Sequence, residues 1–236
     1  MTEPATKYSR VMNSIRSKII SGEYPIGSKL PSEVKMQEEY GVSRVTIRLA
    51  VDGLVKDGLV ERIQGTGSYV RKPKKLSRLV RENSVESFSE VAKENGFNSH
   101  TKVISVDKIP STDFLKKVLH TESDEVLHTE RLRYLEDDPI FLENNYYPLP
   151  RFLDLPSYDL SGSLYTIFKD NFGINSLESD NTILSVKTAN VEFAKLLNRS
   201  VGFPLFYMKT QIFDDKDQVV QYGEQLIVSD RYQFKI

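Results

Sequence analysis

The sequence predicts an α+β protein of two domains, and three patterns lead to this prediction. Residues 7–58 carry apolar positions at helical spacing, residues 59–71 read as a short hairpin, and the remainder alternates helical segments with long strand-like runs. The length of 236 residues fits two domains of ordinary size. A hydrophobic content of 39% is sufficient for a core in each.

The first helix is predicted from apolar residues that recur at helical spacing: Tyr8, Val11, Met12, Ile15 and Ile19. They form one stripe along about four helical turns. Gly22 and Pro25 follow this stripe, and both residue types end helices.

A second helix is predicted over 33–40, with Ser32 in place to cap its first N–H groups. Gly41 follows as a turn residue, because glycine accepts a positive φ without steric cost. Ser43 then caps a third helix, which Gly58 stops. The buried stripe of this third helix is predicted to be Ile47, Ala50, Val51, Leu54 and Val55.

Two short strands at 59–63 and 68–71 come next, joined by the glycine-containing segment 64–67. This is the pattern of a tight β-hairpin. Helix, turn, helix and hairpin in this order predict a winged helix-turn-helix. Such a module places the start of its second motif helix in the major groove of DNA.

The first turns of the third helix carry side chains that suit DNA: Ser43, Arg44, Thr46 and Arg48. Arginine can bind guanine or phosphate through two N–H groups, while serine, threonine and backbone N–H groups bind phosphates. The alternative for such a pattern by itself is an ordinary solvated charged face. Val45 and Leu49 lie off the buried stripe, and contact with thymine methyls, a partner helix or plain exposure all remain open.

The charge is distributed unevenly along the chain. Residues 1–76 hold 14 Lys and Arg against 8 Asp and Glu, a net charge of +6, while the whole chain has a net charge of −1. A basic head on an acidic body is typical of a DNA-binding protein, although chance clustering would give the same count. The absence of cysteine, of a long apolar run and of a secretion signal leads us to expect a cytoplasmic location and no membrane association.

The motifs KLPSE, GVSR, TIR and DGLVERIQGTGSYV resemble the DNA-binding domain of the GntR family of bacterial transcription regulators over about residues 7–72. The resemblance implies a homodimer on palindromic double-stranded operator DNA. Most relatives carry arginine where this chain has Val34, and we expect Lys35 to supply only a phosphate interaction there. The expected DNA contacts are Lys35, Ser43, Arg44, Thr46, Arg48, Gln64, Gly65, Thr66 and Gly67.

The chain is predicted to divide into a DNA-binding domain at 1–72, a basic linker at 73–80 and a second domain at 81–236. Helices of the second domain are predicted at 87–95, 112–119, 163–171 and 190–198. Strands are predicted at 101–109, 125–136, 139–147, 179–187, 203–213 and 218–228. Aspartate-rich hairpin turns join the long strands, which indicates a mainly antiparallel sheet.

Three pieces of the second domain, TERLRYLEDDPIFLENNYYP, SLYTIF and the final FDDKDQVVQYGEQLIVSDRYQF, resemble the UTRA effector-binding domain of HutC-type GntR regulators. The resemblance covers about residues 80–236. It implies a fold like that of chorismate lyase that acts as a small-molecule receptor. The pocket that it implies is formed by Phe88, Ser89, Arg131, Arg133, Glu143, Ser163, Tyr165, Glu224 and Tyr232.

The residue types of this implied pocket suit an anionic ligand. Arg131 and Arg133 are two positions apart on a strand and therefore point to the same side. Ser163 would cap a helix whose N–H groups favour an anion, and the three together form a trap for a phosphate. Glu143 and Glu224 could accept hydrogen bonds from sugar hydroxyls or an amine.

Each of these features also has a purely structural interpretation. The two arginines could form a surface ladder with glutamates nearby, and Ser163 and Tyr165 could be an N-cap and a core aromatic. The glutamates in reach along the strands are Glu130, Glu136 and Glu143.

The sequence therefore predicts a repressor of a sugar uptake or catabolic operon that a phosphorylated sugar or amino sugar releases from DNA. The same type of regulator with a carboxylate or other non-sugar effector, such as urocanate, a fatty acid or a phosphonate, is the alternative. A lyase-like enzyme with a DNA-binding head is a second, remote alternative. We expect no enzyme activity, catalytic residue, metal or cofactor, because His100, His120 and His128 lack ligand spacing and no nucleophile motif is present.

Overall fold

The computed structural model describes residues 7–71, 75–79 and 85–235. Two compact units make up the chain, namely Met1–Lys74 with Asn198–Ser200, and Lys75–Leu197 with Val201–Ile236. The described residues up to Arg71 are called the head, and those from Lys75 onward the body. The predicted domain limits at residues 72 and 80 fall outside the described residues, so these limits stay predictions.

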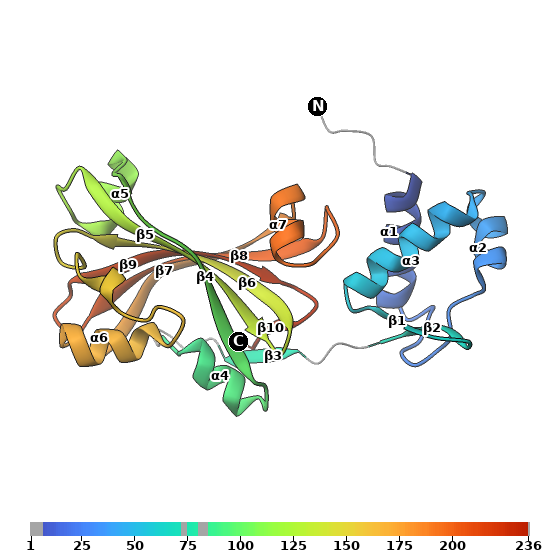
Figure 1. Cartoon of the computed structure of the whole chain (residues 1–236), viewed down its shortest axis with the longest axis horizontal. Helices are drawn as coiled ribbons and strands as arrows, with labels where there is room; N and C mark the ends of the chain where they lie inside the picture. The colour runs from blue at the N-terminus through green and yellow to red at the C-terminus, as the bar shows by residue number, and fades with distance from the viewer. Residues whose placement is uncertain (1–6, 72–74, 80–84, 236) are drawn as a thin grey trace. The chain divides into compact units, whose positions relative to one another are not determined.

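The head is built on three helices, α1 (Lys7–Ile20), α2 (Glu33–Tyr40) and α3 (Arg44–Lys56) (Figure 1). Both predicted apolar stripes form its core, with two exceptions. Tyr8 and Val55 are each 36% exposed, because each lies in a terminal turn of its helix. The buried residues that α1 and α3 contribute are Val11, Met12, Ile15, Ile47, Ala50, Val51 and Leu54.

Capping residues fix where α2 and α3 begin. The hydroxyl of Ser32 accepts the N–H of Lys35, and that of Ser43 accepts the N–H of Thr46, both at 3.3 Å. Gly41 between the two helices has a φ of 61°, as the turn requires. The predicted helix-turn-helix is thus present, and the first turn of α3 is held at the surface of the head.

The hairpin after α3 consists of β1 (Val60–Ile63) and β2 (Gly67–Val70), which pair antiparallel. Val60 and Val70 are buried against the helices and attach the hairpin to the core. Gly67 has a φ of 128°, and a Cβ added there would lie 2.6 Å from Cε of Lys29. The Lys29 side chain could move aside, so it is the positive φ, which other residue types rarely adopt, that favours glycine at this position of the wing.

The body contains one large antiparallel sheet of six strands (Figure 1). All six predicted strands are confirmed to within two residues at each end. In spatial order they are β4 (Ser99–Pro110), β5 (Glu125–Leu135), β6 (Asp138–Pro148), β9 (Val219–Val228), β8 (Pro204–Asp214) and β7 (Leu177–Thr188).

Helices cover both faces of this sheet. α4 (Phe88–Glu94) and α6 (Leu164–Phe172) lie on one side in Figure 1, while α5 (Asp113–Leu119) and α7 (Val191–Leu196) lie on the other. A short 3₁₀ turn, η1 (Leu155–Ser157), precedes α6. The strand alternation places residues such as Leu127 under α6 and Val126 under α5.

A second, two-stranded sheet was not predicted. β3 (Leu76–Leu79) pairs in parallel with β10 (Tyr232–Lys235). Four residues of the predicted linker 73–80 therefore form a strand of the body, which corrects our interpretation of this segment. The pairing joins the two ends of the body in the sequence, so no local hairpin signal marks it.

Candidate functional site

The start of α3 presents polar side chains at the surface of the head. The side chains of Arg44 and Arg48 are 68% and 57% exposed and lie one helical turn apart. The hydroxyls of Ser43 and Thr46 lie 2.9 Å apart, and both belong to the N-terminal cap of the helix. The four side chains that were predicted from the sequence are therefore grouped on one end of α3.

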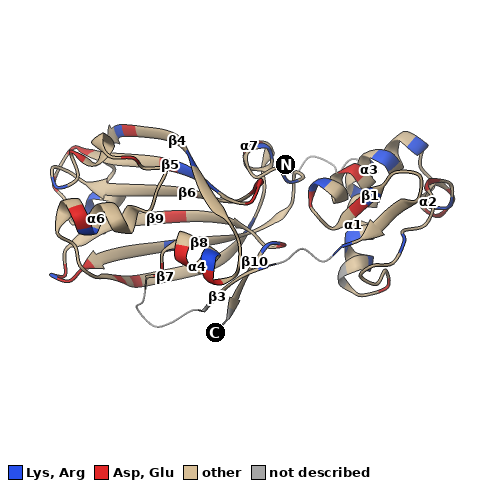
Figure 2. Ribbon diagram, turned by 60° about the horizontal axis from the view of Figure 1, so that its bottom comes forward, with Lys and Arg blue, Asp and Glu red and all other residues tan. Residues whose placement is uncertain are grey.

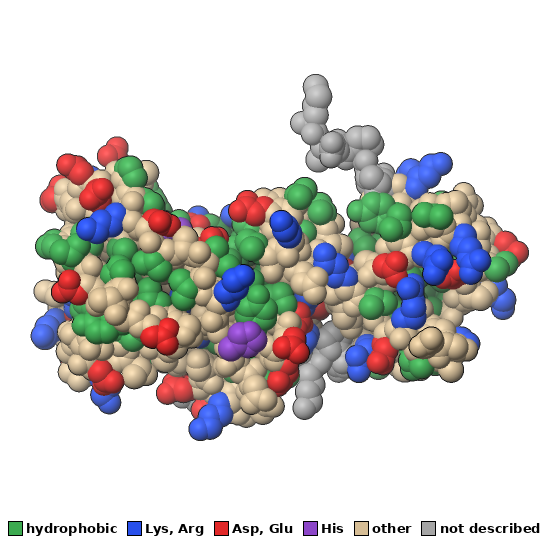
Figure 3. Space-filling view, viewed as in Figure 1, with side chains coloured by type: hydrophobic (Ala, Val, Ile, Leu, Met, Phe, Trp, Pro, Cys, Tyr) green, Lys and Arg blue, Asp and Glu red, His purple; other side chains and the backbone are tan. Residues whose placement is uncertain are grey.

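The neighbouring surface of α2 differs from the pattern that the sequence resembles. Val34, at the place where the family resemblance led us to expect arginine, is 60% exposed, and Lys35 beside it is exposed as well. Lys and Arg side chains gather over α2 and α3 in the space-filling view (Figure 3). The surface is basic, but its cations come mainly from α3.

The wing tip is the second part of the predicted DNA contact. Gln64, Gly65 and Thr66 are exposed, and Gly67 is half-buried. The Thr66 hydroxyl donates to the carbonyl of Ile63 at 3.2 Å, which holds the tip in a tight turn. Two glycines at the tip allow the backbone to approach another molecule closely.

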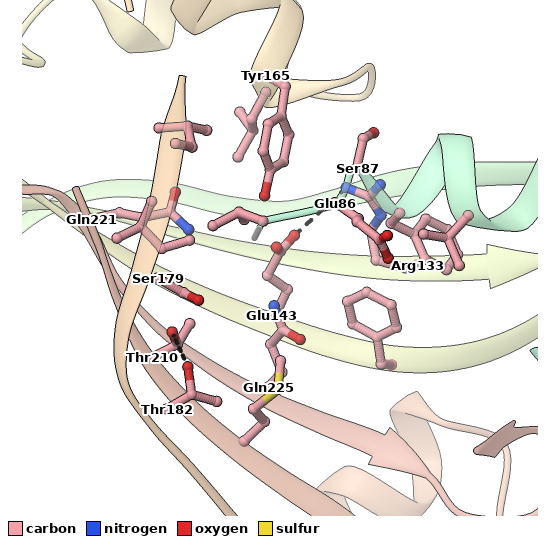
Figure 4. Close-up of a pocket in the computed structure, with 18 of the residues that line it drawn as sticks. Glu86, Ser87, Arg133, Glu143, Tyr165, Ser179, Thr182, Thr210, Gln221 and Gln225 are labelled. Atoms are coloured by element: carbon pink, nitrogen blue, oxygen red, sulfur yellow. Dashed lines mark hydrogen bonds and ion pairs between the residues drawn. The ribbon is translucent and has the colours of Figure 1, made fainter. Parts of the chain in front are cut away.

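A cavity of about 430 Å³ lies in the body between the large sheet and the helices α4 and α6 (Figure 4). This volume is within the range of about 300–1,000 Å³ that small-molecule sites occupy. Seven of the nine predicted pocket residues line it: Phe88, Arg131, Arg133, Glu143, Ser163, Tyr165 and Tyr232.

Arg131 connects the sheet to the segment before α6. Its side chain is 2% exposed, and Nη2 donates to Oε2 of Glu143 at 2.5 Å. Nη1 donates to the carbonyls of Leu160 at 3.1 Å and Gly162 at 3.5 Å. The expected pairing with a glutamate is thus present, but it is buried and does not lie at the surface. Most of the Arg131 guanidinium is already used by the protein.

Arg133 is buried with its charge incompletely matched. It stacks on the Phe88 ring, with Cζ 4.6 Å from the ring centroid, and Nη1 lies 3.6 Å from Oε2 of Glu143. That distance is too long for a hydrogen bond, and Nε has no partner among the described residues. Burial lowers the pKa of Arg133 to about 10, so the guanidinium is still charged at neutral pH.

The first turn of α6 faces the same cavity. Ser163 occupies the N-cap position, but its hydroxyl makes no capping hydrogen bond, which differs from our expectation for this residue. Ser163, Leu164 and Tyr165 all line the cavity. The hydroxyl and the first N–H groups of the helix therefore belong to a segment that lines the same cavity as Arg133, and both favour a negative charge.

Two predicted pocket residues, Ser89 and Glu224, do not line the cavity. Glu224 lies on the opposite face of the sheet, where it accepts a hydrogen bond from the Tyr222 hydroxyl at 3.2 Å. Gln225, the next residue along β9, lines the cavity instead, as does Gln221, four positions before Gln225. Successive strand residues point to opposite faces, so the alternation along β9 was the signal that could have corrected the assignment.

The end of the cavity away from Arg133 carries uncharged polar side chains that we did not predict. The hydroxyls of Thr182 and Thr210 lie 2.8 Å apart, on β7 and β8. Thr182 lies within an irregularity in the pairing of these strands, between Asp180 and Ile183. The polar residues labelled at this end in Figure 4 are Ser179, Thr182, Thr210 and Gln221, while Gln225 lies nearer the middle, next to Glu143.

The histidines take ordinary positions in the body. His100 stacks on Tyr134 and His128 on Tyr146, with ring centroids 4.5 and 4.8 Å apart. No histidine is among the residues that line the cavity. Within the described part of the chain, no cluster of acidic and histidine side chains could hold a metal, and no helix combines the length and apolar character that a membrane crossing needs.

The buried Arg131–Glu143 pair leads to a stability prediction. Arg131→Ala removes the hydrogen-bonded cation of Glu143 and leaves the more distant Arg133 as its remaining ion-pair partner among the described residues, so the free energy of unfolding of the body should fall by about 3 kcal/mol. The double variant Arg131→Met, Glu143→Leu removes both charges, and its free energy of unfolding should fall by much less. Urea unfolding followed by circular dichroism checks both, and equal losses in the two variants would contradict the assigned role of the pair.

Two family models match this chain. Residues 7–70 match the model of bacterial regulatory proteins of the gntR family. Residues 94–233 match the model of the UTRA domain. Together the two matches cover the helix-turn-helix of the head and most of the body.

Named relatives and a solved structure agree with these matches. The chain is 30% identical to the mannosyl-D-glycerate transport/metabolism system repressor MngR of Escherichia coli strain K12, over 97% of this chain and 94% of the relative. It is 31% identical to the probable fructoselysine utilization operon transcriptional repressor of Shigella flexneri, over 92% and 88%. The crystal structure of PhnF from Mycobacterium smegmatis superposes with a TM-score of 0.65 at 24% identity, over 95% and 97% of the two chains.

Proposed function

Because the chain belongs to the gntR family of bacterial regulatory proteins and carries a UTRA domain, we propose that this DNA-binding transcriptional repressor controls a sugar uptake or catabolic operon. A phosphorylated sugar or amino sugar in the body cavity is the effector that releases it from DNA. The recognition surface is the start of α3 with the wing tip, and the receptor is the cavity around Arg133.

Arg133 is the observation that carries the anionic part of this proposal. A buried charge that lacks hydrogen-bonded partners is costly, and an anionic ligand group would supply them. Arg133 and the first turn of α6, whose N-cap Ser163 makes no capping hydrogen bond, both line the cavity. A phosphate can accept from both, because it offers several oxygens.

The polar end of the cavity supports a sugar as the remainder of the effector. Hydroxyl and amide groups from β7, β8 and β9 can both donate to and accept from sugar hydroxyls. Two of the relatives are named for sugar-derived compounds, namely mannosyl-D-glycerate and fructoselysine. Those names support the sugar class, without indicating which sugar this chain binds.

A thermal-shift series on the purified protein tests the effector class. Glucose, glucosamine, N-acetylglucosamine and common disaccharides are compared with and without a 6-phosphate, since a ligand of the native state raises the melting temperature. A rise with phosphorylated members only is expected. No rise with any member would contradict the sugar phosphate proposal, and carboxylates, fatty acids and phosphonates would then be compared in the same way.

The proposed repressor acts as a homodimer on a palindromic operator. Two heads would then occupy half-sites about one helical turn of DNA apart, or a multiple of it. Effector binding would shift the population of dimers away from the head spacing that fits the operator. Sedimentation at micromolar concentration should show a dimer, and footprinting should show two symmetric protected half-sites. A monomer that protects a single half-site would exclude this arrangement.

A further inference from the structure

Glu33, the first residue of α2, contacts both arginines at the start of α3. Its Oε2 lies 2.7 Å from Nε of Arg44, and its Oε1 lies 3.5 Å from Nε of Arg48. The carboxylate is held between two successive turns of α3, because positions 44 and 48 lie on the same face of that helix. Glu33 is only 29% exposed, although both arginines extend into solvent.

The Nε group of Arg44 donates a hydrogen bond to Glu33, whereas that of Arg48 forms a longer ion pair with the same carboxylate, and the ends of both side chains stay available. Among the described residues, neither Arg44 nor Arg48 makes a polar contact other than the one with Glu33. A guanidinium has five N–H groups in a rigid planar fork, so holding Nε limits the directions in which the two terminal nitrogens can point. Two N–H groups are what a bidentate contact with guanine needs.

The negative charge of Glu33 by itself should weaken DNA binding. DNA is a dense row of phosphates, and a carboxylate on the DNA-facing surface weakens the attraction of a basic head. Lys and Arg positions are marked in blue along the ribbon of the head in Figure 2, and Lys and Arg side chains gather on the face of the head seen in Figure 3. The carboxylate must therefore contribute something other than net attraction if it favours binding.

We infer that Glu33 is a positioning residue for DNA recognition, which orients Arg44 and Arg48 before the operator arrives. Long arginine side chains lose rotational freedom when they bind, and a side chain that is already oriented loses less. This pre-orientation should strengthen binding to operator DNA, where base contacts depend on geometry. It should not strengthen binding to non-specific DNA, where charge alone determines the affinity. This inference rests on the proposal that the two arginines contact the operator.

The test compares Glu33→Ala with Glu38→Ala in the full-length protein. Glu38 is an exposed glutamate on the same helix without a contact to either arginine, so its replacement removes the same charge and nothing else. Dissociation constants are measured for the operator and for a scrambled duplex of equal length. Glu33→Ala should bind the operator about tenfold more weakly, with the scrambled duplex bound equally well or better. Glu38→Ala should leave the ratio of the two constants unchanged.

Two further measurements separate positioning from other roles. A negative charge at the start of α2 also stabilises that helix, so the melting temperature of each variant is recorded. The operator affinity is also measured at low salt in the Arg44→Ala background. There Glu33→Ala should reduce the operator affinity clearly less than it does in the wild type, because Glu33 acts partly through Arg44.

Tighter or unchanged operator binding by Glu33→Ala, with an unchanged ratio, would overturn the inference and make Glu33 a plain repulsive charge. Equal costs in both backgrounds would likewise exclude an action through Arg44. Full operator binding by Arg44→Ala would instead overturn the proposed DNA contact itself, so the two failures are distinguishable.

Discussion

Arg133→Ala should leave operator binding unchanged and raise the effector concentration that releases the operator by about 100-fold. Hydrogen bonds to a charged group contribute about 1.5–3 kcal/mol each, and every 1.4 kcal/mol is a factor of ten. The guanidinium is buried at the cavity wall, far along the chain from the head, and it stacks on Phe88 without a hydrogen bond to the described residues. Electrophoretic mobility shifts of the operator, titrated with effector, measure both quantities.

The chain offers matched controls for this variant. Arg133→Lys keeps the charge but not the planar fork, so it should respond at intermediate effector concentrations. Glu224→Gln alters a polar residue of the same sheet on its other face and should respond like the wild type. Release of Arg133→Ala at the wild-type concentration would show that the anionic group binds elsewhere.

Local patterns were sufficient to predict most of the fold. Ser32, Gly41 and Ser43 act within three or four residues of their own position, and each takes the predicted role. The six long strands were predicted from strand-like runs, several of them joined by aspartate-rich turns, and the structure has a strand at each of these places. The parallel pair β3 and β10 was missed, because it joins four-residue segments about 150 positions apart and one of them follows a basic run.

The candidate site could be predicted only in part, for a related reason. Residue types and the family resemblance indicate which strands face the cavity, but they do not show which groups a side chain already contacts. Arg131 and Arg133 look equivalent in the sequence, yet only Arg131 reaches the carbonyls of Leu160 and Gly162. That distinction depends on the course of a loop about 30 residues away, which no local pattern records.

Arg44→Ala should abolish specific operator binding while non-specific DNA binding persists. A bidentate contact between arginine and a base contributes about 1–3 kcal/mol of discrimination, and a homodimer would lose it in both half-sites. The expected cost is therefore about 2–6 kcal/mol for the operator. Arg44 is exposed at the first position of α3, so its replacement removes little from the core. Footprinting on operator DNA checks the prediction, and an intact footprint would contradict it.

Lys35→Ala is the control for Arg44→Ala, because it should remove a phosphate contact and not a base contact. Lys35 is exposed on α2, next to Val34, and we expect it to contact phosphate only. Its loss should weaken binding to operator and scrambled DNA alike and lower the slope of log affinity against log salt by about one per head. Arg44→Ala should instead reduce the ratio between the two DNAs. If both variants changed only the salt slope, α3 would serve as a basic surface, and sequence would have to be read by the wing or by the exposed Val45 and Leu49.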